Sequence, residues 1–149
     1  MKALFRHLWM VILLFTLANN GWAASLLKQQ IAKAGLSREQ ASEVLLLVLQ
    51  HQKIPQPPAS TIEYLTKKDG GDLAAEYFAF GVTGDSANNG ASTVYGMFAV
   101  DRQTGDVWEW NLCKRYRFAR LTQLQNVVMQ KTGKRLAAAR AVKAELGCG

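Results

Sequence analysis

The chain has 149 residues, of which 49% are hydrophobic, and its 18 lysines and arginines outnumber its 11 aspartates and glutamates. The formal net charge of +7 is concentrated near the C-terminus, because residues 112–149 carry nine basic side chains and one acidic side chain. This length predicts one domain with a single core, and the absence of internal repeats or low-complexity segments excludes a repeat array and a disordered chain.

The first residues have the order of charge and hydrophobicity found in secretory signal peptides. Two basic residues, Lys2 and Arg6, precede an apolar run from Leu8 to Ala18, and small residues surround a cleavage point after Ala23. The run is shorter than the ~20 residues that span a bilayer. We therefore expect residues 1–23 to be a signal peptide, with an uncleaved anchor as the alternative. The mature chain is then a single periplasmic or secreted domain without a transmembrane segment.

Turn residues and hydrophobic periodicity predict helices before a central sheet. A short helix from Leu26 should end at Gly35, and Ser37 with Gln40 forms a capping box. This box opens a leucine-rich helix that runs to about Gln52 and is expected to be the main core element. Asn, Asp and Gly residues then separate segments rich in aromatic and β-branched residues. The expected strands are Thr61–Lys67, Glu76–Val82, Thr93–Val100 and Asp106–Trp110.

Two further helices are expected near the C-terminus, from Arg120 to Lys131 and from Lys134 to Leu146. The predicted fold class is α+β, with N-terminal helices, an antiparallel three- to four-stranded meander and a C-terminal helical hairpin. Cys113 precedes this hairpin and Cys148 follows it, so an antiparallel helix pair would bring the two sulfurs together. Disulfides persist after export, and we expect a Cys113–Cys148 bond; an intermolecular bridge or a redox-active thiol are the alternatives.

Catalytic residues are not expected. The mature chain has a single histidine, His51, so neither a zinc site nor a Ser/Cys-His triad can be assembled. A carboxylate pair drawn from Asp101, Asp106 and Glu109 is conceivable, but aspartate at hairpin ends is ordinary turn chemistry. The sequence therefore predicts a protein that is not an enzyme and that uses no metal and no cofactor.

Two groups of residues are candidates for binding a partner. Tyr95, Trp108 and Trp110 lie on the meander, where aromatic side chains form either an interface or the core. A second candidate is the basic C-terminal surface, which suits an acidic protein or an anionic envelope polymer, or is simply solvated. Its candidate residues are Arg135, Arg140 and Lys143. Export argues against nucleic acid as the partner, and the sequence does not indicate the oligomeric state.

The helix opening Ser37–Ala41 and the hairpin pattern Val-Asp-x-x-Thr-Gly-x-Val, from Val100 to Val107, carry a family resemblance. Together they resemble the PepSY-type small domain of bacterial envelope proteins over Ser37 to Trp110. The resemblance implies that residues 24–149 are one PepSY-like α+β domain that binds without catalysis, in several cases inhibiting peptidases.

Size, export and a single disulfide give a looser resemblance to periplasmic inhibitors and immunity proteins. We therefore expect an inhibitor or immunity protein that acts on a periplasmic peptidase or cell-wall hydrolase. The partner is then an envelope protein. The alternative is a polyanion-binding envelope protein that acts through its basic C-terminal helices.

Overall fold

The computed structural model describes residues 31–69, 71, 73–85 and 92–148. The expected signal peptide, residues 1–23, lies outside the described residues. Of the first expected helix, residues 31–34 are described and are not helical; they lead into a turn closed by a β-bridge between Ala32 and Gly35. None of the helices in the described ranges has the length and apolar character that crossing a membrane requires.

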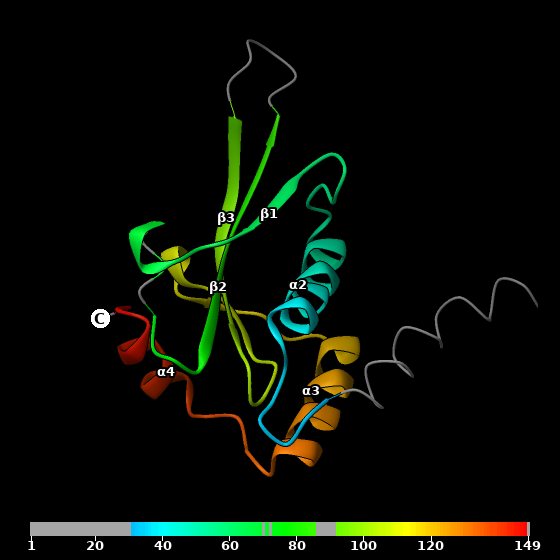
Figure 1. Cartoon of the computed structure of the whole chain (residues 1–149), viewed down its shortest axis with the longest axis vertical. Coiled ribbons are helices and arrows are strands. Elements are labelled where there is room, and N and C mark those ends of the chain that lie inside the picture. Colours follow the sequence, from blue (N-terminus) through cyan, green and yellow to red (C-terminus); the bar gives the residue numbers. More distant parts are fainter. Residues whose placement is uncertain (1–30, 70, 72, 86–91, 149) are drawn as a thin grey trace, which may run out of the picture. The chain divides into compact units, whose positions relative to one another are not determined.

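Five antiparallel strands form one sheet in which each strand pairs with its neighbours in sequence (Figure 1). The connection between the first two strands contains the 3-10 turn η1 (Lys67–Asp69). The α+β class and the antiparallel meander are confirmed, and the meander has five strands because a short one follows Cys113. The strands are β1 (Thr61–Tyr64), β2 (Tyr77–Asp85), β3 (Ser92–Asp101), β4 (Val107–Glu109) and β5 (Lys114–Arg115).

Helix α2 (Arg38–Gln52) begins at the capping box that the sequence predicts. The Gln40 amide donates to Ser37 Oγ at 3.2 Å, and the Ser37 amide donates to Gln40 Oε1 at 2.9 Å. The helix contacts β2, β3 and the following helix α3 (Ala119–Thr132). Its fully buried side chains form the leucine-rich face expected from sequence, namely Ala41, Val44, Leu45, Val48 and Leu49.

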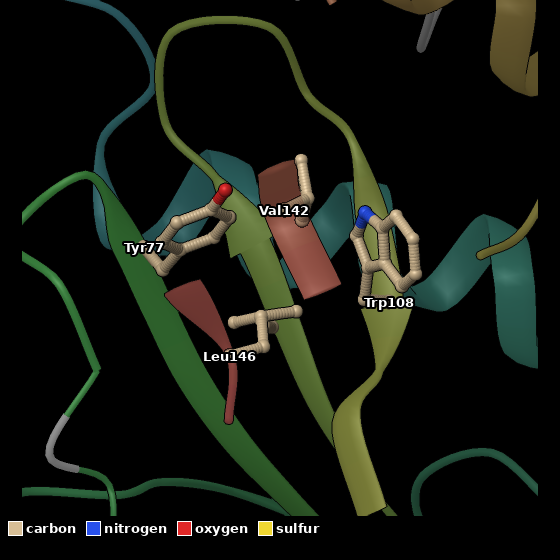
Figure 2. Close-up of a cluster of buried hydrophobic side chains, with 5 residues drawn as sticks. Tyr77, Trp108, Val142 and Leu146 are labelled. Atoms are coloured by element: carbon tan, nitrogen blue, oxygen red, sulfur yellow. The ribbon is translucent and has the colours of Figure 1, made fainter. Parts of the chain in front are cut away.

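Helix α4 (Ala139–Glu145) covers a different part of the sheet. Figure 2 shows Val142 and Leu146 lying between Tyr77 of β2 and Trp108 of β4, and Ala99 of β3 completes this buried cluster. The Tyr77 hydroxyl also donates to Glu145 Oε2 at 3.0 Å. Both expected C-terminal helices are present and flank the strands, but the second begins at Ala139 instead of Lys134. They do not pack on each other as the expected hairpin, because α3 lies beside α2, whereas α4 has its own cluster (Figure 1).

The disulfide expected from sequence is present and joins Cys113 to Cys148, with their Cα atoms 5.6 Å apart. Cys113 directly follows the 3-10 turn η2 (Trp110–Leu112), and Cys148 lies just beyond α4. The bond therefore attaches the end of the α4 segment to the connection between β4 and β5. This attachment matters because an isolated helix of seven residues is far below the ~12–15 residues needed for stability in water.

Candidate partner-binding surfaces

Trp108, a candidate for binding, lies in the core. Its side chain is 1% exposed, and its Nε1 donates to Asp106 Oδ2 at 2.8 Å. Arg115 of β5 holds the same carboxylate: its Nε donates to Asp106 Oδ1 at 2.8 Å and its Nη2 lies 2.7 Å from Oδ2. The guanidinium also lies over the Trp108 ring, 5.5 Å from its centroid. This buried triad stabilises β4 and β5 and is closed to a partner.

The other two carboxylates considered for catalysis also have partners within the fold. The Tyr116 hydroxyl donates to Glu109 Oε2 at 2.5 Å, and burial together with this bond raises the pKa of Tyr116. Asp101 Oδ1 accepts the amides of Gln103 at 2.7 Å and Thr104 at 3.0 Å. Burial raises the pKa of Asp101, and these hydrogen bonds oppose the shift. Each carboxylate thus holds a turn or a strand in place.

The described residues do not assemble metal ligands either. Within the described part of the chain, no group of three or more His, Cys, Asp or Glu side chains could hold a metal ion. The histidine His51 stacks on Phe118 instead, with ring centroids 4.0 Å apart and an angle of 10° between the ring planes. Two surfaces of the described residues are candidates for contact with a partner.

The first candidate surface is an unpaired stretch of β3. Strand β4 pairs only with Phe98–Val100, so Ser92–Tyr95 has no described strand on that side, and Ser92–Val94 pairs with β2 on the other. We call Ser92–Tyr95 the free edge of β3. In Figure 1, β2 and β3 project beyond the other strands here. Large apolar side chains are exposed on and beside it: Val94 (64% exposed), Met97 (38%) and, on η2, Leu112 (61%).

Tyr95, a binding candidate from sequence, belongs to this free edge. It is the extra residue at a β-bulge, because Gly96 pairs with Val82 while Val94 pairs with Thr83. Its half-buried ring lies against Gly84, where an added Cβ would come within 2.6 Å of the ring. Trp110 is also half-buried and packs against the Tyr77–Trp108 cluster. Of the three aromatic candidates, Tyr95 therefore lies on an open edge, whereas Trp108 lies in the core and Trp110 packs against it.

The second candidate surface is the basic one. Arg135, in the connection before α4, is exposed, as are Arg140 and Lys143 on α4 itself. Among the described residues, no carboxylate forms an ion pair with any of the three. Arg140 and Lys143 line a hollow of about 480 Å³ together with Ala139, Ala144 and Cys148. The chemistry of this surface suits anionic groups.

Sequence reasoning missed Val94, Met97 and Leu112 as surface residues. They belong to strand and turn segments whose apolar side chains would ordinarily be buried. Val94 lies in the part of β3 that β4 does not reach, and it is 64% exposed. The signal that could have indicated this was the difference in length between the expected strands Thr93–Val100 and Asp106–Trp110, because the shorter strand leaves part of the longer one without a neighbour.

The chain matches known proteins in two comparisons. The model of a family described as "T6SS, Immunity protein Tgi2PP" matches residues 35–139. A chain in the "Structure of a type VI secretion system effector-immunity complex from Pseudomonas protegens" is 38% identical, with a TM-score of 0.71. This alignment covers 82% of the present chain and 97% of the other chain. No curated protein matches the sequence.

The resemblance to PepSY domains is wrong. The matched region, residues 35–139, includes the whole of Ser37–Trp110 and belongs to a different family. The Val-Asp-x-x-Thr-Gly-x-Val pattern reflects turn geometry instead: Asp101 accepts two amides within the loop, and Thr104 Oγ1 accepts the Asp106 amide at 3.3 Å. Turn chemistry alone can account for these residues, so the pattern does not identify a family.

Proposed function

This chain belongs to the family of the type VI secretion system (T6SS) immunity protein Tgi2PP, and we propose that it binds one toxic effector and inhibits it without catalysing a reaction. The observation that carries the proposal is the match to a chain of an effector–immunity complex, at 38% identity over 97% of that chain. The structure supports a contact mechanism, because Asp101, Asp106 and Glu109 are held by partners within the fold.

The proposed target is a cell-wall hydrolase or peptidase, met in the periplasm. Two features support this compartment: the signal-peptide pattern of residues 1–23, and the Cys113–Cys148 disulfide, since disulfides persist in oxidising compartments and are rare in the cytosol. An effector that is neutralised there has the cell wall within reach.

The test is to tag the full chain at its C-terminus in the bacterium that produces it, and to purify it from the periplasmic fraction. We expect one exported hydrolase at a 1:1 ratio, and the mass of the purified chain should correspond to cleavage after Ala23. Adding the purified protein to that hydrolase should abolish its degradation of isolated cell wall. A partner whose activity is unchanged at saturating immunity protein would contradict the proposal, and a cytoplasmic partner would contradict the proposed compartment.

A second candidate function is binding to an anionic envelope polymer through the basic surface. It is favoured by the exposure of Arg135, Arg140 and Lys143 without a carboxylate partner among the described residues. Contacts between exposed charges are screened within ~10 Å at 0.1 M salt. Binding to purified wall polymer should therefore fall steeply with salt and be lost when the three residues are changed to glutamine. Binding that survives both changes excludes this candidate.

A further inference from the structure

The free edge of β3 carries only one of the features that keep edge strands from pairing. An edge strand exposes backbone N–H and C=O groups that can pair with another chain, and proteins usually protect such edges with charged residues, proline, β-bulges or very short strands. The bulge at Tyr95 leaves Ser92–Val94 in regular register with β2. Ser92–Tyr95 contains no charge and no proline, and it is part of a ten-residue strand. Its three outermost residues are exposed, with Val94 at 64%. Another chain can therefore pair with this edge.

Next to the free edge, a side chain already takes the place of a missing strand. The Met97 amide donates to Asn111 Oδ1 at 3.4 Å, just beyond the point where pairing with β4 ends at Phe98. Asn111 belongs to η2, which contacts β3 and carries the exposed Leu112. On the side of β3 that faces β4, the backbone therefore has neighbours within the protein as far as Met97. No described strand lies beside Ser92–Tyr95 on that side.

We propose that the effector docks an extended segment against Ser92–Tyr95 as an additional strand of the sheet, with apolar side chains that contact Val94 and Leu112. This inference rests on the proposed function and specifies its partner surface. Main-chain hydrogen bonds supply affinity in this mode of recognition, and the flanking side chains supply specificity. The occupant is a strand because the groups without a described strand neighbour are those of a backbone, and Leu112 belongs to η2, which contacts β3.

A second copy of this chain is the less suitable occupant. The chain carries a net charge of +7, of which Lys2 and Arg6 in the expected signal peptide supply two charges. Two mature copies would each still carry +5 and would repel each other on approach. An effector segment has no such restriction, and a relative of 38% identity occurs in an effector–immunity complex.

The test compares two lysine substitutions on opposite edges of the sheet. Val94→Lys places a charge on the free edge of β3, whereas Thr61→Lys places the same charge on an exposed position of β1, the outermost strand at the other side. Both positions are exposed, so both variants should unfold at the wild-type temperature. The probe is the hydrolase recovered with the wild-type chain, purified and titrated against each variant by calorimetry. We expect Val94→Lys to weaken binding at least tenfold and Thr61→Lys less than twofold.

Amide hydrogen exchange reads the backbone pairing directly. In the complex, the outward-facing amides within Ser92–Tyr95 should exchange at least tenfold more slowly than in the free protein, while those of Thr61–Tyr64 are unchanged. Equal affinity for Val94→Lys and wild type, with unchanged exchange in Ser92–Tyr95, would refute docking at the free edge of β3 without affecting the proposed immunity function. Failure of the wild-type chain to bind any effector would overturn both. A wild-type dimer in sedimentation equilibrium that Val94→Lys dissociates would assign the edge to a second copy, against the proposal.

Discussion

Replacing Asp106 with asparagine should destabilise the protein strongly, although the two side chains have nearly the same size. The carboxylate accepts Trp108 Nε1 and forms a two-point contact with Arg115, and the two charged side chains are only 3% and 8% exposed. Removing one member of a buried ion pair leaves the other charge without compensation, which typically costs about 3–5 kcal/mol. For a domain of this size, that corresponds to a fall in Tm of roughly 10–20 °C.

The assay is equilibrium unfolding in urea at pH 7, followed by circular dichroism. Glu43→Gln, which removes an exposed carboxylate from α2, is the matched control and should leave the midpoint unchanged. In the double variant Asp106→Asn with Arg115→Met the buried charge is gone as well, so the loss should be smaller than the sum of the two single losses. A loss below ~1 kcal/mol for Asp106→Asn, or strict additivity, would refute the assignment of Asp106 as a structural anchor.

Two further predictions concern the disulfide and Asp101. Replacing both Cys113 and Cys148 with serine should lower the free energy of unfolding by ~4 kcal/mol, the chain-entropy value for a separation of 35 residues; a reductant should destabilise the wild type but not this variant, and insensitivity of the wild type would contradict the prediction. Burial raises the pKa of Asp101 above its usual value of 3.8, so its contribution to stability is complete below that value and is lost as pH rises through the raised pKa. Asp101→Asn keeps an oxygen acceptor for the loop amides but has no group that titrates. Its free energy of unfolding should therefore rise relative to that of wild type between pH 4 and pH 7; urea titrations at both pH values that show a constant difference would disprove this.

Local interactions explain what the sequence could predict. Ser37 and Gln40 are three residues apart, and their reciprocal capping bonds need no tertiary contact, so the start of α2 is legible from sequence. The leucine-rich face of α2 follows from helical periodicity in the same way. The positions of Cys113 and Cys148 before and after two expected helices predict their bond correctly. The bond forms even though those helices flank the sheet instead of pairing with each other.

Long-range pairing explains what the sequence could not predict. Strand β5 has only two residues, too few for a hydrophobic pattern to mark it. It begins directly after Cys113, whose backbone is in the left-handed region at φ 52°. Without β5, Arg115 has no known neighbour, and its contact with Asp106 cannot be inferred. The choice between core and surface for Trp108 likewise depended on α4 reaching that face of the sheet.

The position of α4 also determines what tryptophan fluorescence can report about the unfolding of this protein. Of the four tryptophans in the chain, Trp9 and Trp22 precede the proposed cleavage point, so a chain cleaved after Ala23 would retain only Trp108 and Trp110. Both belong to, or pack against, the cluster that Val142 and Leu146 close. Tryptophan fluorescence of such a cleaved chain would therefore report on the packing of α4 against the sheet, whereas the far-ultraviolet signal is dominated by the longer helices α2 and α3. Comparing the two signals during unfolding reveals whether α4 leaves the sheet in the same step in which α2 and α3 unfold or in a separate step.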